Sequence, residues 1–119
     1  MKLFTGKQLM LLIGNSMEYA ACRKSGKPEP EFKPVVKLFC PWNGATWLLT
    51  ELDPEDLDTA FGLCDLGMGE PEVGTVSLAE IRNVQGPAGL KIERDLHFKA
   101  DKTLEQYADE ARRLGRIRA

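Results

Sequence analysis

The chain has 119 residues, with 16 Lys and Arg against 18 Asp and Glu, one His, three Cys, and a formal net charge of −2 at pH 7. Its 43% hydrophobic and 29% charged residues are typical of a globular protein and exclude a disordered or fibrous chain. This length favours a single domain over residues 1–119, because two independent cores would be hard to build. There is no cleavable apolar leader and no apolar run of membrane length, so we expect a soluble, cytoplasmic protein with no membrane contact.

The first predicted element is a helix that begins after Thr5. Thr5 and Gln8 have the spacing of a capping box, and a mostly apolar stripe then continues to about residues 21–23. Residues 24–34 contain three prolines together with lysine, glycine and serine, and this composition cannot continue a helix. We therefore expect an exposed loop at about residues 24–34.

Strand patterns follow this loop in close succession. The segments are short and apolar, and they are separated by an Asn-Gly turn, an acidic turn and a glycine-rich break. Their connections are too short for crossover helices, so we expect neighbouring strands to pair antiparallel as a meander. The predicted strands are residues 35–40, 45–53, 59–66, 73–78 and 92–98.

Two more helices complete the predicted fold. Ser77 is placed to cap a short helix over residues 78–84, and Thr103 is placed to cap a C-terminal helix with an apolar stripe. The sequence thus predicts an α+β fold. An antiparallel meander sheet of about five strands carries the N-terminal and C-terminal helices, and we expect the helices on one side of it.

Charge is distributed unevenly along the chain. Residues 1–37 hold seven bases and three acids, residues 38–80 hold nine acids and no base, and residues 81–119 hold nine bases and six acids. One interpretation is an acidic surface on the sheet that meets a basic protein partner. The other is that these acids solvate ordinary turns and that the flanking helices neutralise them. Under the first interpretation, the partner-binding candidates are Asp53, Glu55, Asp56, Asp58 and Trp42.

Aromatic and arginine side chains suggest further contacts. We expect Trp47 and Phe39 in the core and Trp42, which lies in the Asn-Gly turn, at the surface. An arginine-rich C-terminus offers possible contacts to nucleic-acid phosphates, although the acidic balance of the chain favours a protein partner. These arginines are Arg112, Arg113, Arg116 and Arg118.

A third pattern bears on catalysis. Alternate residues of the predicted strand 92–98 are acidic or histidine and would project to one face. Together with two carboxylates of the central strands, they would suit a divalent metal that activates water in a nuclease or phosphoesterase. The other interpretation is the solvated face of an edge strand. The candidate set is Glu51, Asp65, Glu93, Asp95 and His97.

No motif in the sequence requires a cofactor. The three cysteines, Cys22, Cys40 and Cys64, form no C-x-x-C pair and are typical of reduced thiols packed as small apolar side chains. No phosphate-binding glycine loop occurs, and a single histidine excludes a His-rich zinc centre within one chain. We therefore expect no cofactor, and the oligomeric state is left open.

A distinctive pattern runs through residues 34–39, 44–54, 60–67, 74–78 and 92–98. These segments resemble a bacterial family labelled domain of unknown function 2958. The resemblance covers nearly the whole chain, is most specific over residues 44–67 and is loosest in the loop at 24–33. It implies an accessory protein of mobile genetic elements, and it brings no catalytic residues with it. Together with the charge pattern, it favours a non-catalytic interaction module; the alternative is the metal-dependent hydrolase.

Overall fold

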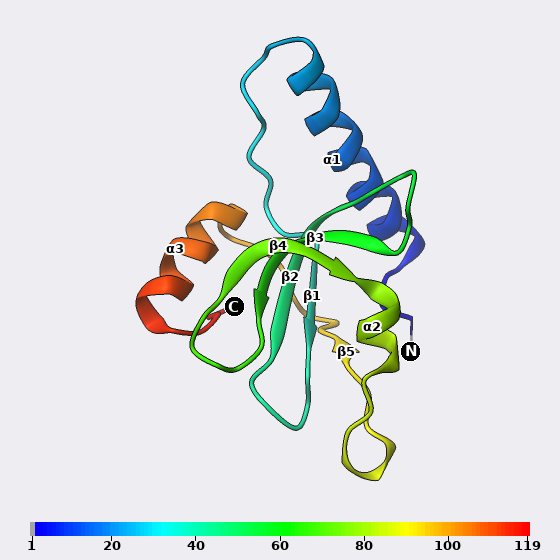
Figure 1. Cartoon of the computed structure of the whole chain (residues 1–119), viewed down its shortest axis with the longest axis vertical. Helices are drawn as coiled ribbons and strands as arrows, with labels where there is room; N and C mark the ends of the chain where they lie inside the picture. Colours follow the sequence, from blue (N-terminus) through cyan, green and yellow to red (C-terminus); the bar gives the residue numbers. More distant parts are fainter. Residues whose placement is uncertain (1) are drawn as a thin grey trace.

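A computed structural model describes residues 2–119 as one sheet with helices around it (Figure 1). Helix α1 (Gly6–Lys24) comes first and projects beyond the sheet. The strands β1 (Val36–Phe39), β2 (Thr46–Leu52), β3 (Thr59–Asp65) and β4 (Glu72–Ser77) follow. The remaining elements are α2 (Leu78–Asn83), the short 3-10 turn η1 (Pro87–Gly89), β5 (Glu93–Arg94) and α3 (Leu104–Leu114). Within residues 2–119, no helix has the length and apolar character needed to cross a bilayer.

The sheet is antiparallel and has the order β4-β3-β2-β1-β5, which confirms the predicted α+β meander. The Asn-Gly turn joins β1 to β2, where the side chain of Asn43 accepts a hydrogen bond from the N–H of Ala45 at 2.8 Å. Strand β5 is much shorter than the predicted strand 92–98. Its chain turns away because the carboxylate of Asp95 accepts the N–H of His97 at 2.9 Å.

Capping boxes begin both long helices; the sequence predicts the box at Thr5, and at Thr103 it predicts the capping residue alone. At α1, the N–H of Gln8 donates to the Thr5 hydroxyl at 3.0 Å and the N–H of Thr5 donates to the Gln8 side chain at 2.9 Å. Thr103 and Gln106 make the same reciprocal pair at α3. Helix α3 then ends at Gly115, whose φ of 74° is a left-handed conformation that favours glycine.

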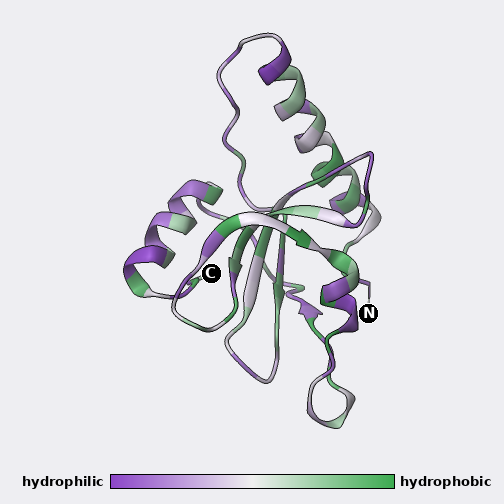
Figure 2. Cartoon of the chain, in the orientation of Figure 1, coloured by the Kyte–Doolittle hydropathy of each residue, from purple (hydrophilic) through white to green (hydrophobic). Residues whose placement is uncertain are grey.

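The two long helices pack on opposite faces of the sheet, so the expectation that they share one side is wrong. Leu49 of β2 packs in one core with Leu12 of α1, whereas Leu48 packs in a second core with Leu104 of α3. Successive strand residues point to opposite faces. Residues 47–50 of β2 are all buried, so both faces of this strand must be covered, and one helix on each face provides that cover. Figure 2 shows the central strands coloured largely toward the hydrophobic end.

A register irregularity in β2 determines which way Glu51 points. Leu49 pairs with Gly62, but Glu51 pairs with Phe61, so Thr50 is one extra residue between the two pairs. A bulge of this kind reverses the alternation of the side chains that follow it. Glu51 is therefore carried to the α3 face of the sheet, beside Phe61.

Candidate partner-binding site

The acidic turn between β2 and β3 is held together largely by its own carboxylates. Asp53 accepts the N–H of Glu55 at 2.9 Å. Asp56 accepts the N–H of Asp58 at 3.1 Å and the hydroxyl of Thr59 at 2.8 Å. These carboxylates shape the turn, while Glu55 is exposed at its tip. The predicted partner-binding residues therefore have different roles.

Asp58 anchors the start of helix α2. The Ser77 hydroxyl donates to one of its carboxylate oxygens at 2.6 Å, and the N–H of Ala79 donates to the other at 2.7 Å. The hydrogen bond from Ser77 and then that from Ala79 hold the pKa of Asp58 below its usual value. Asp58 is thus a structural residue that joins the β2–β3 turn to α2.

We expect Asp58→Asn to lower the melting temperature by a few degrees at neutral pH. The folded-state pKa of Asp58 lies below the ordinary value of 3.8, so its contribution is complete above that value. The contribution is lost as the pH falls through the lower folded-state pKa. Thermal unfolding of both proteins between about pH 7 and about pH 2 should show the difference disappearing in acid. A difference that stays constant down to the lowest pH would contradict this role.

Two adjoining hollows open where the end of β2 and the start of β3 meet. Helix α1, the segment 29–32 and the start of α3 form the remaining walls. Their volumes are about 350 and 370 Å³, enough to admit a side chain of a partner. Both are lined by Glu51 and Phe61, and we call them together the Glu51 cleft. Thr75 of β4, the register partner of Phe61, extends the floor of the second hollow.

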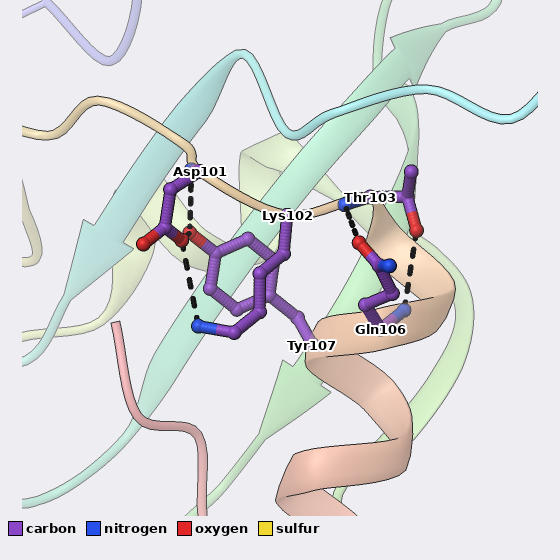
Figure 3. Close-up of polar contacts among 5 residues, drawn as sticks. All are labelled: Asp101, Lys102, Thr103, Gln106 and Tyr107. Atoms are coloured by element: carbon purple, nitrogen blue, oxygen red, sulfur yellow. Dashed lines mark hydrogen bonds and ion pairs between the residues drawn. The ribbon is translucent and has the colours of Figure 1, made fainter.

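Three sets of contacts hold the walls of the Glu51 cleft. The side-chain amide of Asn15 on α1 donates to the carbonyl of Thr50, at the bulge, at 3.0 Å. The N–H of Leu104 donates to the carbonyl of Phe32 at 2.9 Å and ties the segment 29–32 to α3. The start of α3 is itself fixed by Tyr107, whose hydroxyl donates to Asp101 at 2.9 Å (Figure 3).

The Glu51 cleft combines carboxylates with aromatic rings. Tyr19, Phe32 and Phe61 line the first hollow, and none of the Lys and Arg side chains that the structure describes lines either hollow. Burial raises the pKa of Glu51, because the desolvated carboxylate lacks a compensating positive charge. A cation between these groups would gain from both the carboxylates and the ring faces. The acids that line the cleft are Glu29, Glu31, Glu51, Asp53, Glu55 and Glu105.

Arg23, at the rim of the cleft, already contacts both an aromatic ring and a carboxylate. The guanidinium of Arg23 lies 6.0 Å from the ring centre of Tyr19 and 3.9 Å from the carboxylate of Glu29. The Arg23 and Glu29 side chains are both more than half exposed, so the pair remains in contact with solvent. The rim is therefore compatible with a guanidinium between a ring and a carboxylate.

The acids of residues 38–80 are not directly paired with the basic ends of the chain. Each ion pair found within residues 2–119 uses an acid from outside this segment. The acids nonetheless fall into two groups, because the turns 53–58 and 66–71 lie at opposite ends of β3. The group nearest the β2–β3 turn is the one that contributes to the Glu51 cleft.

The structure does not gather the five residues of the predicted metal set. Asp65 is 2% exposed and accepts the N–H groups of Gly67 at 2.8 Å and Ile117 at 3.0 Å. Asp95 lies 3.4 Å from the ammonium of Lys37 and shares a hollow with His97. Within the part of the chain that the structure describes, no three His, Cys, Asp or Glu side chains are close enough to hold a metal ion. Glu51 lines its own cleft, and Glu93 pairs with Phe39 in the sheet.

Trp42 does not have the exposed position that its turn predicts. Its ring packs against the α1-side core and lies directly over Gly86, where an added Cβ would be 2.5 Å from the ring. Trp47 is buried, as expected, and Phe39 is half-buried. The four C-terminal arginines are exposed, and Arg112 is paired with Asp109 at 3.0 Å.

The three cysteines form no disulfide among residues 2–119, and Cys40 is buried while the other two are partly buried. Burial, together with nearby Glu72, raises the pKa of Cys64 to about 11. That thiol stays protonated at neutral pH and is a poor nucleophile.

Sequence reasoning missed several residues of the cleft, namely Tyr19, Glu29, Glu31, Phe32 and Glu105. The segment at 24–34 was interpreted only as an exposed loop, and residues 24–29 are indeed exposed. The overlooked signal is Phe32, an aromatic residue between two prolines in an otherwise polar segment. Its carbonyl accepts the first N–H of α3, and its ring lines the first hollow.

Fold and site together define a small α+β protein whose antiparallel sheet is covered on both faces and bordered by a cleft of carboxylates and aromatic rings. Over residues 3–118 the chain matches the family described as "Protein of unknown function (DUF2958)", and it belongs to this family. The resemblance seen in the sequence is thereby confirmed over nearly the whole chain. No curated protein and no solved structure matches the chain.

Proposed function

We propose that the protein is a non-catalytic interaction module whose Glu51 cleft binds a cationic segment of a protein partner. The observation that carries this proposal is that carboxylates line both hollows around Glu51, with three aromatic residues in the first and Phe61 in the second. None of the Lys and Arg side chains of residues 2–119 lines either hollow, and Arg23 contacts the first one only at its rim. A lysine or arginine of the partner would supply the charge that the desolvated carboxylate lacks. The contact would also determine which residue of the partner segment lies beside Glu51.

The partner that best fits this chemistry is a basic protein that handles nucleic acid or acts in defence. Such proteins carry the Lys and Arg segments with which they neutralise phosphates. The family resemblance supports the same direction, since it implies an accessory protein of mobile genetic elements. In this proposal the acidic cleft engages the segment that the partner otherwise uses for DNA or RNA.

A metal-dependent nuclease or phosphoesterase is not the function we propose. It would need the carboxylates and His97 at a common point, and the described residues do not place them there. Direct nucleic-acid binding through the C-terminal arginines is opposed by the acidic balance of the chain. The hollows that Arg113 and Arg118 line also hold carboxylates, among them Asp101 and Glu110.

The test is calorimetric titration of the protein with a nonapeptide of alternating arginine and glycine. We expect saturable binding that weakens with added salt and becomes about tenfold weaker in the double variant Glu31→Gln, Glu51→Gln, which removes two charges of the cleft. The matched control is the double variant Glu72→Gln, Glu80→Gln, which removes two exposed acids that do not line the cleft, and it should bind as the original protein does.

Equal affinity of the cleft variant and the control would contradict the proposed site. Binding of an oligonucleotide of similar length, in place of the peptide, would contradict the proposed class of partner. Thermal unfolding of each variant shows that it is folded before its affinity is compared.

A further inference from the structure

The outer face of α1 is apolar and faces solvent. Met10 is 75% exposed, Met17 is 59% exposed and Leu11 is 49% exposed, whereas only Leu12 of this helix is fully buried. A helix at a protein surface normally carries polar residues on the side away from the core. Figure 2 shows α1 coloured mostly from white to green, in contrast to the purple stretches of α3.

Met10 and Met17 belong to a continuous stripe of apolar and small residues along α1. Met10, Gly14, Met17 and Ala21 follow one another at steps of four, three and four residues, which is the spacing of a helix–helix seam. At about 100° per residue, the stripe lies on the opposite side of the helix from Leu12. Gly14 and Ala21 are both exposed and small, so another backbone can approach closely between the two methionines.

Charges beside the stripe indicate what covers it. Lys7 and Glu18 flank the stripe on the same side, one toward each end of α1. If two copies of α1 pack antiparallel with their midpoints between Met10 and Met17, a two-fold axis brings Lys7 of each copy to the level of Glu18 of the other, within about 3 Å along the axis. The face is therefore complementary to itself in charge as well as in its apolar surface.

We infer that α1 pairs antiparallel with α1 of a second copy of this chain, to give a two-fold symmetric dimer. The methionine stripes pack against each other at the centre, and two Lys7–Glu18 contacts close the two ends. This inference does not depend on the proposed function, because its contacts require no basic partner. It places the second copy next to the Glu51 cleft, since Met17 also lines the second hollow.

Sedimentation equilibrium of the full chain, over a range of concentrations, tests the inference. We expect a species of twice the chain mass whose dissociation constant rises about tenfold in either Lys7→Glu or Glu18→Lys, because each change places like charges at both ends of the seam. The combined variant Lys7→Glu, Glu18→Lys should recover the original dissociation constant, since it restores opposite charges. Lys91→Glu, an exposed charge far along the chain, should leave it unchanged.

A second variant keeps the test independent of the charge contacts. Met17→Glu places a carboxylate in the apolar stripe, and we expect it to leave only single chains with the same far-UV circular dichroism. The inference is overturned by a single-chain mass at every concentration, or by a dimer that persists in Met17→Glu. It is also overturned if the dimer of the combined variant Lys7→Glu, Glu18→Lys dissociates as readily as the dimers of the single variants. Residues 7 and 18 of the two copies would then not be in contact.

Discussion

We expect Gly62→Ala to lower the free energy of unfolding by about 3 kcal/mol or more, the largest stability effect of any single methyl group added to this sheet. A Cβ at Gly62 would lie 2.0 Å from the carbonyl oxygen of Leu48 and 2.8 Å from Cα of Leu49. Both are backbone atoms of β2, so no side-chain rotation can relieve the overlap. The added methyl group must instead push β2 and β3 apart next to the bulge at Thr50.

Gly74→Ala provides a matched control for this prediction. Gly74 is the register partner of Gly62 in β4, and nothing lies within 4 Å of a Cβ built there. We expect the stability of this variant to change by less than about 1 kcal/mol. Urea unfolding of the two variants makes the comparison. Equal losses would mean that the close approach at Gly62 is not a constraint of the native sheet.

The second large effect is expected for Asp65→Ala, with a loss of about 3 kcal/mol. The buried carboxylate accepts the N–H of Ile117, which holds the C-terminal tail against the core beside α3. Removing it leaves a buried amide without an acceptor and detaches Ile117 from that core. Hydrogen exchange should show the Ile117 amide becoming exposed at a lower free energy than in the original protein.

Asp65→Asn separates hydrogen bonding from packing. Its amide keeps the shape of the side chain and one acceptor oxygen, so we expect about half of the loss caused by alanine. If alanine costs less than about 1 kcal/mol and the Ile117 amide keeps its protection, Asp65 does not hold the tail.

The elements that the sequence predicted well are those with strong local signals. The pair Asn43-Gly44 closes a hairpin by contacts between neighbouring residues, and the capping box at Thr5 and the cap at Thr103 act over three residues. Strand β5 was overestimated because alternation alone does not reveal that Asp95 closes a turn with its own neighbour. The placement of the helices on the two faces depends on contacts between distant segments, which only the buried run in β2 indicates.

The candidate site was predicted only in part, for the same physical reason. The sequence analysis named the acidic turn as the partner-binding site and Glu51 only as part of a metal set. The turn uses Asp56 and Asp58 for its own hydrogen bonds. The cleft is built across the chain by the contact between Phe32 and Leu104 and by the bulge that redirects Glu51. Neither the bulge nor this contact leaves a periodic pattern in the sequence.

The ionisation of Glu51 gives the most direct test of the proposed binding site. Carbon-13 NMR of its side-chain carboxyl group, followed as a function of pH, reports the pKa in the free protein and with the arginine-glycine nonapeptide present. We expect a pKa above the ordinary value of 4.5 in the free protein, because the carboxyl group is desolvated. Saturating peptide should lower that pKa, because a guanidinium beside Glu51 stabilises its charged form. A Glu51 pKa that the bound peptide leaves unchanged, or raises, would mean that no cation is held in the Glu51 cleft.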